Sequence, residues 1–313
     1  MAVTQRAEPR ADGAERIVAV VLTMCRPREL ERLLGSLSAQ DHRPAEIIVV
    51  ENTPHPENAA LLAHRPGVRH VVSRRNLGGA GGFAYGIYLA LAAGATHVWL
   101  MDDDGRPETE WCLGDLLSAC RRHDADLVSP VILDSSDPTR LAFPYFTRLR
   151  RFETRAALTR HGVVEGFAHL FNGALVRASA FERFGMPDFR LFLRGDEVDF
   201  LHRMRRGGGV ILSLPEVGFL HPPGAPETHP ILGGALNAVM PGDPAKQYYF
   251  FRNRGYLVRQ HRLVLHLVSD LVRYPYHFLV TRRGDVAGLV RWIGLGAQGW
   301  RQVFHRHDTP GRR

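Results

Sequence analysis

The first hundred residues of the chain alternate short apolar runs with segments of helical pattern. Residues Ile17–Thr23 (IVAVVLT) form a continuous, mostly β-branched run, which is typical of a strand buried on both faces of a parallel sheet. Residues 28–40 place four leucines at helical spacing, with Pro27 near the expected start of that helix. Further strands are expected at 46–50, 68–73 and 96–101, and a further helix at 83–93. This alternation predicts a doubly wound α/β sheet that binds ligands at the carboxyl ends of its strands.

The second half of the chain is less regular. Residues 127–219 mix short strands with helices, and a segment rich in proline and glycine at 222–244 is expected to be a loop. Helices are expected from Lys246 onward, where aromatic residues and arginines are frequent. The sequence contains no internal repeat and no low-complexity tract.

The composition is that of a globular protein with a sizeable core, because the 313 residues are 45% hydrophobic and 23% charged. The net charge of +8 comes almost entirely from arginine, since Lys246 is the only lysine. Arginine forms bidentate contacts with phosphate, so acidic ligands or an anionic membrane surface are plausible partners. Charge alone leaves nucleic acid open as a partner.

Cysteine use and hydropathy indicate a cytoplasmic protein. Cys25, Cys112 and Cys120 are odd in number and form no C-x-x-C pair, which argues for a reducing compartment and against a disulfide framework or a zinc site. Residues 1–16 are polar and lack the apolar core of a signal peptide, and no run of about 18 apolar residues occurs. We therefore expect a disordered tail at 1–16 and no transmembrane helix.

A glycine-rich stretch at residues 75–86 (RNLGGAGGFAYG) follows the third expected strand. Gly79, Gly81 and Ala84 satisfy the pattern G-x-G-x-x-G/A, and a carboxylate follows about 20 residues later at Asp102. The pattern is typical of a dinucleotide-binding loop. It fits a sugar nucleotide equally well, so the stretch by itself leaves the ligand open.

Three consecutive aspartates, Asp102, Asp103 and Asp104, follow the fourth expected strand. Residues i and i+2 of an extended backbone point to the same side, so two carboxylates converge. A dinucleotide site needs one acidic group, and three anions beside a pyrophosphate repel it unless a divalent cation lies between them. The triplet therefore favours a metal-bridged nucleotide diphosphate over NAD, with a solvated acidic turn as the alternative.

Two later motifs carry further candidate residues. Asp196 and Glu197, in RGDEVDF, stand where a helix is expected to begin, and a carboxylate there either caps that helix or removes a proton from an attacking hydroxyl. His221, in GFLHP, ends an apolar segment, where its imidazole is either structural or completes an oxygen-rich metal shell.

The order of these motifs resembles that of the GT-A family 2 of inverting glycosyltransferases. Within it, the chain is most similar to the galactofuranosyltransferases that begin the galactan of actinobacterial cell walls. The resemblance covers about residues 17–285. The motifs that carry it are SRRNLGGAGGFAYG (73–86), DDDG (102–105), DPTRLAFP (137–144), LFNGALVRAS (170–179), LRGDEVDF (193–200), LHP (220–222), FRNRGY (251–256) and FLVTRR (278–283).

The resemblance implies a fold and a division of the chain. The fold is a GT-A, Rossmann-like mixed sheet flanked by helices, with a C-terminal helical region. The nucleotide-sugar and catalytic domain spans 17–225, the helical and membrane-associating region spans 226–305, and a tail spans 306–313.

The resemblance also assigns roles to particular residues. Asp102, Asp104 and His221 hold Mg2+ or Mn2+ against the donor diphosphate. Glu197 is the base, with Asp196 as its neighbour; many relatives have Asp at the base position, so which acid of the pair acts as base stays open. The uridine and diphosphate are held by Thr23, Arg26, Glu51, Arg75, Asn76, Gly79 and Asp103.

The implied activity is metal-dependent, inverting transfer of galactofuranose from UDP-galactofuranose to a polyprenyl-diphosphate-linked rhamnosyl-N-acetylglucosamine. Three alternatives stay open: a rhamnosyltransferase of the same fold that uses dTDP-rhamnose, an NAD-binding oxidoreductase, and an inactive membrane-surface scaffold.

Residues 263–300 interleave apolar and aromatic residues with arginines, as in a surface that lies on an anionic leaflet or in a helical cap with a solvated basic face. The resemblance therefore implies a peripheral protein on the inner face of the plasma membrane, with a lipid-linked acceptor and no nucleic acid as partner. The oligomeric state is left open.

Overall fold

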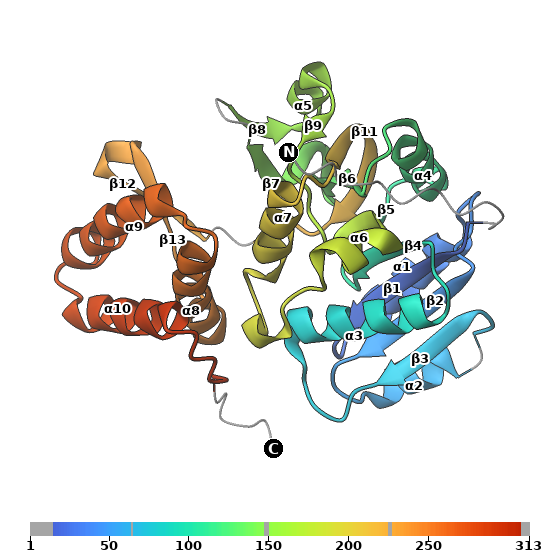
Figure 1. Cartoon of the computed structure of the whole chain (residues 1–313), viewed down its shortest axis with the longest axis horizontal. Helices are drawn as coiled ribbons and strands as arrows, with labels where there is room; N and C mark the ends of the chain where they lie inside the picture. The colour runs from blue at the N-terminus through green and yellow to red at the C-terminus, as the bar shows by residue number, and fades with distance from the viewer. Residues whose placement is uncertain (1–14, 64, 147–149, 225–226, 308–313) are drawn as a thin grey trace, which may run out of the picture.

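The computed structural model describes residues 15–63, 65–146, 150–224 and 227–307. Within these residues, a large mixed sheet flanked by helices forms one part of the molecule, and the C-terminal helices form a second part beside it (Figure 1). The path of the large sheet is β3-β2-β1-β4-β10-β6-β11-β5, and β7, β8 and β9 pair with its members. The expected α/β sheet with a C-terminal helical region is confirmed.

The N-terminal half follows the predicted alternation. Its four strands pair in parallel, so that their carboxyl ends lie at one edge of the sheet. The elements are β1 (Ile17–Thr23), α1 (Pro27–Ser38), β2 (Glu46–Glu51), α2 (Pro56–Leu62), β3 (Val68–Val72), α3 (Gly78–Ala92) and β4 (His97–Asp102).

The second half makes the sheet mixed. Strand β10 (Asn172–Arg177) runs antiparallel between β4 and β6 (Leu127–Asp134), whereas β11 (Ile211–His221) runs parallel to β6. The remaining elements are β5 (Arg106–Pro107), α4 (Cys112–Arg122), β7 (Asp137–Phe146), β8 (Arg151–Thr154), α5 (Arg155–His161), β9 (Val164–Glu165), α6 (Ala178–Phe184), η1 (Phe189–Leu191) and α7 (Asp196–Arg206).

Alternate residues of β1 pack into two different layers, because successive side chains of a strand point to opposite faces. Ile17, Ala19 and Val21 lie in the core that α1, α2 and α4 cover, and the residues between them lie in the core that α3, α6 and α7 cover. All seven residues of β1 are buried. The unbroken apolar run of this strand is therefore explained by burial on both faces.

Helix α3 begins at Gly78, five residues before its predicted start. Its glycines allow close packing within the protein: an added Cβ would lie 2.4 Å from Leu22 at Gly82, and 2.4 Å from Val20 at Gly86. Gly78 has a φ of +70°, and its Cβ would lie 2.0 Å from the carbonyl oxygen of Phe192. Gly82 and Gly86 thus let α3 pack closely on the sheet, whereas an added Cβ at Gly79 meets nothing within 4 Å.

The segment at 222–244 is not simply a loop, as the sequence led us to expect. Its described part contains an antiparallel hairpin, which the turn η2 (Leu232–Gly234) connects. Short strands flanked by several prolines and glycines carry too little apolar pattern to be recognised from sequence. The hairpin strands are β12 (Thr228–Ile231) and β13 (Leu236–Val239).

Three helices follow the hairpin where the sequence predicts helices. They are α8 (Pro244–Gln260), α9 (Val264–Tyr276), which continues into the π-helical turn η3 (His277–Thr281), and α10 (Val286–Trp300). Glycines bring α8 and α10 together, since an added Cβ at Gly255 would lie 2.0 Å from the carbonyl oxygen of Gly296. One at Gly299 would lie 1.7 Å from the carbonyl oxygen of Arg252. Helix α8 is thereby fixed to the C-terminal helices along one side.

Most of the two expected tails, 1–16 and 306–313, lies outside the described residues. At the N-terminal boundary, Glu15 forms an ion pair with Arg121, and Arg16 forms one with Glu46 at 2.8 Å. Among the helices that the structure describes, none combines the length and the apolar character needed to cross a bilayer.

Candidate active site

The aspartate triplet lies at the edge of the sheet where the parallel strands end. Asp102 is the last residue of β4 and pairs with Leu22 of β1, which places the triplet next to Thr23. The ion pair between Asp104 and His221, the last residue of β11, joins this strand end to the triplet. The edge is where the doubly wound topology predicts a ligand site.

Asp103 is held by the loop that follows β1. Its Oδ2 accepts a hydrogen bond from Thr23 Oγ1 at 2.7 Å, and its Oδ1 lies 3.2 Å from Arg26 Nη1. Burial raises the pKa of Asp103 to about 6, although Thr23 and Arg26 oppose the shift. Both oxygens have protein partners, so Asp103 fixes Thr23 and Arg26 at the mouth of the site.

Asp104 lies between two cationic or proton-donating groups. Its carboxylate is 2.5 Å from Arg26 Nη1 and 3.1 Å from His221 Nε2. Burial alone would raise the pKa of Asp104, but the hydrogen bonds and charges of His221 and Arg26 outweigh it and lower the pKa to about 2. Asp104 is therefore ionised at neutral pH, with one oxygen beside Arg26 and the other beside His221.

The pKa of Asp102 is shifted in the opposite direction to that of Asp104. Burial raises its pKa well above the usual value, and the charges of Asp104 and Asp103 add to that effect. The pair Asp102 and Asp104 with the imidazole of His221 is a donor set that suits Mg2+ or Mn2+. In the described part of the chain, no three such side chains already converge closely enough to hold an ion. A cation held by these residues would take its remaining ligands from substrate phosphate oxygens and water, as is usual for Mg2+.

The other residues expected to bind nucleotide differ in how accessible they are to a ligand. Glu51 is buried, and its two oxygens are taken by Asn58 Nδ2 at 2.8 Å and His70 Nε2 at 2.7 Å. Asn76 lies next to the β1 loop, with its Nδ2 3.6 Å from the sulfur of Met24. Arg75 is exposed. Arg75, Asn76 and Gly79 are thus accessible to a ligand, whereas Glu51 already has partners within the protein.

The acidic pair begins helix α7. Gly195 precedes it in a left-handed conformation with a φ of +92°, which turns the chain into the helix. The Oε2 of Glu197 accepts a hydrogen bond from the backbone N–H of Leu170 at 3.1 Å. Burial and the charge of Asp196 raise the pKa of Glu197 to about 8, and burial raises that of Asp196 to about 6.

The triplet and the acidic pair face the same region. The N–H of Asp102 donates to the carbonyl oxygen of Phe171 at 2.9 Å, and the N–H of the preceding residue, Leu170, donates to Glu197 Oε2 at 3.1 Å, so both acidic groups border residues 170–171. A carboxylate whose pKa lies near neutrality, beside a possible cation site, has the properties of a general base.

His169 is a site residue that sequence reasoning missed. Its Nδ1 lies 3.8 Å from Glu197 Oε1, and its ring is surrounded by Phe143, Tyr145 and Phe167, with centroid distances between 5.0 and 5.4 Å. Burial lowers the pKa of His169 to about 4, so the ring is neutral at physiological pH. Phe143 also lies 5.1 Å from the His221 ring. No local sequence pattern marks His169, because only the fold brings β7 and the segment before β10 to α7.

The Glycosyl transferase family 2 profile matches residues 18–184, which is more than half of the chain. The chain belongs to this family and is a glycosyltransferase, and the alternative of an NAD-binding oxidoreductase is overturned. Among its relatives is the galactofuranosyltransferase GlfT1 of Mycolicibacterium smegmatis, 42% identical over 299 residues, with 93% of this chain and 99% of the relative covered. GlfT1 of Mycobacterium tuberculosis is 43% identical over 297 residues, with 93% and 97% covered.

Two solved structures share the fold at low sequence identity. Staphylococcus aureus TarS (residues 1–349) matches with a TM-score of 0.56 and 14% identity, over 91% of this chain and 80% of that chain. GalNAc-T7, solved with UDP, GalNAc and Mn2+, matches with a TM-score of 0.55 and 13% identity, over 79% of this chain but only 48% of that chain. They confirm the GT-A fold.

Proposed function

We propose that the protein transfers galactofuranose, with inversion, from UDP-galactofuranose to a lipid-linked acceptor, a polyprenyl-diphosphate-linked rhamnosyl-N-acetylglucosamine. The observation that carries this proposal is the acidic pair near the aspartate triplet and His221, in which Asp196 is buried and Glu197 is half-buried. The names of the relatives supply the sugar, and the edge of the sheet supplies a place for a nucleotide diphosphate.

The donor would bind with its diphosphate at the triplet. Asp102, Asp104 and His221 would hold Mg2+ or Mn2+, which when bound offsets the negative charge of the leaving UDP. Thr23 and Arg26 are fixed by Asp103 at the end of β1, so that Arg26 can contact a phosphate oxygen. Arg75, Asn76 and Gly79 would contact the nucleotide from the opposite loop.

Glu197 would then act on the acceptor. Its carboxylate takes the proton of the acceptor hydroxyl while that oxygen forms a bond to the anomeric carbon, and the bond from that carbon to the UDP oxygen breaks. Attack from the face opposite to UDP inverts the configuration. The N–H of Leu170 and the neutral ring of His169 keep Glu197 oriented without a charge that would lower its basicity.

A rhamnosyltransferase that uses dTDP-rhamnose stays the second candidate. The loop N-L-G-G-x-G-G-F at 76–83 also resembles that of family 2 rhamnosyltransferases. We would offer a synthetic rhamnosyl-N-acetylglucosamine lipid together with each donor, with and without EDTA, and follow product mass. A gain of hexose from UDP-galactofuranose that EDTA abolishes is the expected result. A gain of deoxyhexose from dTDP-rhamnose would move the protein to the second candidate, and no gain would leave the substrate assignment unsupported.

We further propose that the C-terminal helices rest on an anionic membrane. Helices α9 and α10 and the turn η3 expose an apolar face, whose most exposed member, Leu265, has 84% of its surface accessible. The face comprises Val264, Leu265, Val268, Leu271, Val272, Leu279, Val280, Val286, Val290, Ile293 and Trp300. Exposed arginines on the same segment, Arg282, Arg283 and Arg291, complement anionic headgroups.

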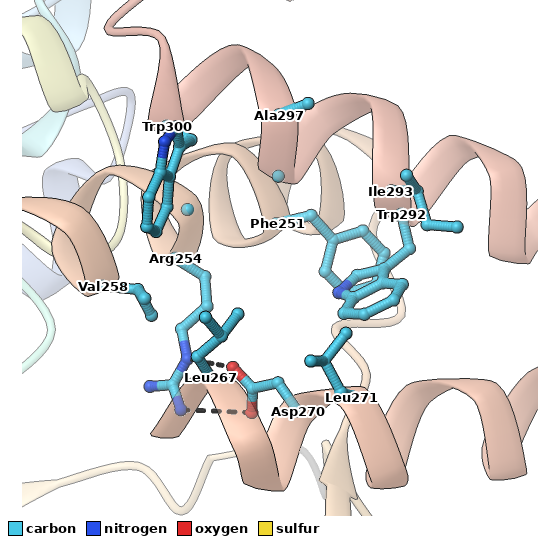
Figure 2. Close-up of a pocket in the computed structure, with 12 residues that line it drawn as sticks. Phe251, Arg254, Val258, Leu267, Asp270, Leu271, Trp292, Ile293, Ala297 and Trp300 are labelled. Carbon is cyan, nitrogen blue, oxygen red and sulfur yellow. Dashed lines mark hydrogen bonds and ion pairs between the residues drawn. The ribbon is translucent and has the colours of Figure 1, made fainter. Parts of the chain in front are cut away.

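A groove between α8, α9 and α10 continues this face inward. Leu271, Ile293 and Trp300 belong to both, and Phe251 and Trp292 line the groove deeper in (Figure 2). The one ion pair drawn there joins Arg254 to Asp270 at 2.7 Å, so both charges are satisfied and the rest of the lining is apolar. Such a groove can take acyl or prenyl chains when the face meets a leaflet.

Binding to vesicles tests this surface. The double variant Leu265→Asp with Val268→Asp is expected to lower co-sedimentation with phosphatidylglycerol-containing vesicles by about tenfold, because two exposed apolar contacts are replaced by charges of the lipid's own sign. Val163→Asp, which alters an exposed apolar side chain on the catalytic domain, serves as the control. Equal binding of the double variant and the wild type would contradict the proposal.

A further inference from the structure

The FRNRGY motif at residues 251–256 lies in the middle of α8 and takes no part in the mechanism above. Two of its polar residues, Arg252 and Asn253, are each only 1% exposed. Groups as polar as a guanidinium and a carboxamide are buried at high cost unless their hydrogen bonds are satisfied. Their partners therefore indicate what the motif does.

The partners of Asn253 are backbone carbonyls of the segment that leads into α7. Its Nδ2 lies within hydrogen-bonding distance of three carbonyl oxygens, those of Leu191 at 3.0 Å, Leu193 at 3.0 Å and Arg194 at 2.6 Å. Its Oδ1 accepts a hydrogen bond from Arg252 Nε at 2.9 Å, which fixes the orientation of the amide. Both N–H groups of Asn253 are therefore directed toward the residues that immediately precede Asp196 and Glu197.

This segment has an uncommon backbone. Phe192, Arg194 and Gly195 have φ values of +64°, +67° and +92°, and only glycine adopts such values readily. Carbonyl groups that converge on one point also repel one another unless a donor lies between them. The conformation that precedes the acidic pair therefore depends on a donor from outside the segment, and Asn253 provides it.

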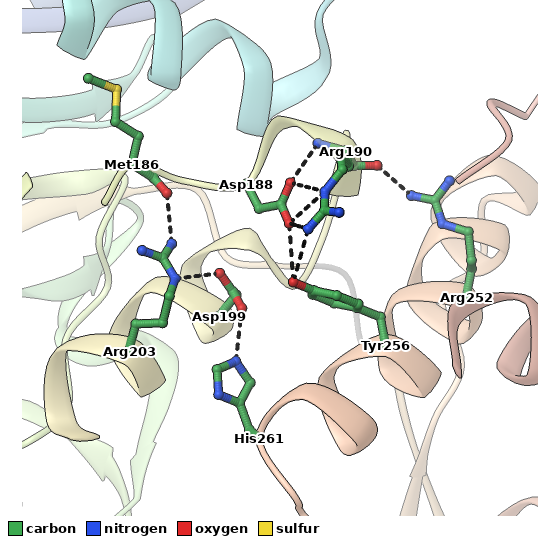
Figure 3. Close-up of polar contacts among 8 residues, drawn as sticks. All are labelled: Met186, Asp188, Arg190, Asp199, Arg203, Arg252, Tyr256 and His261. Atoms are coloured by element: carbon green, nitrogen blue, oxygen red, sulfur yellow. Dashed lines mark hydrogen bonds and ion pairs between the residues drawn. The ribbon is translucent and has the colours of Figure 1, made fainter. Parts of the chain in front are cut away.

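Neighbouring residues of α8 reinforce this attachment. The Nη2 of Arg252 donates to the carbonyl oxygens of Arg190 at 3.1 Å and Leu191 at 2.9 Å. Tyr256 donates to Asp188 at 3.2 Å, and His261 contacts Asp199 of α7 at 2.8 Å (Figure 3). Gly195 packs against Asn253 and Leu257, where an added Cβ would lie 3.4 and 3.2 Å away.

We infer that Asn253 is a positioning residue for the transfer reaction: its carboxamide N–H groups hold residues 191–195 in the conformation that presents Glu197 to the acceptor hydroxyl. The inference rests on the proposed role of Glu197. It assigns to the C-terminal helices a direct part in building the active site, since α8 is fixed to α10 by Gly255 and Gly299 on its other side.

Asn253→Asp in the full-length protein is the most direct test, because it keeps the size and shape of the side chain, keeps an acceptor for Arg252 and removes both N–H donors. Displacement of the base by about 1 Å is expected to lower kcat about 100-fold. The KM for the nucleotide sugar and the binding of UDP with MnCl2, measured by calorimetry, stay within about twofold of wild type. The reason is that Asn253 binds carbonyls of residues 191–194, whereas the triplet is held by Thr23, Arg26 and His221. Loss of packing alone would leave kcat unchanged in this isosteric variant.

Asn253→Gln keeps the donors but displaces them by one methylene, and it is expected to recover kcat to within about tenfold of wild type. It also keeps the test decisive if the aspartate variant does not fold. Tyr248→Phe, which removes a hydrogen bond from α8 to the carbonyl of His305, is the control and keeps full activity.

Two results would overturn the inference, provided that Glu197→Gln lowers kcat about 10³-fold. They are a wild-type kcat in Asn253→Asp, and a fall in UDP binding in that variant that matches its fall in kcat. If Glu197→Gln itself retains activity, the proposed function fails, and the two failures are thereby told apart.

Discussion

Glu197→Gln is expected to lower kcat about 10³-fold while the KM for the donor changes little, since general-base catalysis contributes about 10²- to 10⁴-fold. Glutamine fills the same space and still accepts a hydrogen bond from the N–H of Leu170, which Glu197 Oε2 accepts at 3.1 Å. It cannot take a proton from the acceptor hydroxyl. Initial rates with saturating donor and acceptor measure the effect.

Two companion variants make this result specific. Glu182→Gln alters an exposed glutamate on α6 and is expected to keep wild-type rates. Asp196→Asn tests the other acid of the pair, and a larger loss there than at Glu197 would transfer the role of base to Asp196. Full transfer activity of both Glu197→Gln and Asp196→Asn would instead place the base elsewhere.

The pH profile gives the same assignment independently. Burial raises the pKa of Glu197 to about 8, so the carboxylate is largely protonated at neutral pH in the free enzyme. Because a base must be deprotonated, kcat/KM is expected to rise with pH and to reach half its limit near that value. The rise should disappear in Glu197→Gln. A profile that is already flat between pH 6 and about 9 in the wild type would contradict the assignment.

The parts of the fold that the sequence predicts well are those whose pattern is set by local burial. Strand β1 shows its burial on both faces as an unbroken apolar run, and its bounds agree with the expected ones. The start of α3 was placed too late because its glycines resemble a ligand-binding loop, although Gly82 and Gly86 serve contacts with Leu22 and Val20. Such contacts depend on the tertiary structure and leave no local signal.

The residues of the candidate site likewise fall into those that the sequence predicts and those that it does not. Asp102, Asp104 and His221 stand at strand ends, where a short motif and the topology together predict a ligand site, and the fold brings Asp104 within 3.1 Å of His221. His169 and Asn253 were not predicted as site residues. Each contacts a group from a distant part of the chain: His169 lies beside Glu197, and Asn253 donates to carbonyls of residues 191–194. Only the packing of α7 and α8 reveals such roles.

Asp104→Asn is expected to lower kcat/KM about 10³-fold at any concentration of metal below saturation, because one charged ligand of the cation and its electrostatic support for the leaving UDP are lost together. The amide keeps the volume of the carboxylate, which now lies 2.5 Å from Arg26 and 3.1 Å from His221. The protein should therefore stay folded. Activity should recover in part as Mn2+ is raised, so that the metal activation curve moves to higher concentration.

The position of that curve separates a metal ligand from a residue that only organises the site. Asp115→Asn, an exposed acid on α4, is the matched control and should leave the curve in place. If Asp104 served only to orient Arg26 and His221, the variant would lose rate without any shift in metal dependence. Transfer that proceeds unchanged in EDTA, in wild type and variant alike, would rule out the cation that the triplet is proposed to hold. A shifted curve would instead make Asp104 the residue through which the sheet edge binds the donor diphosphate.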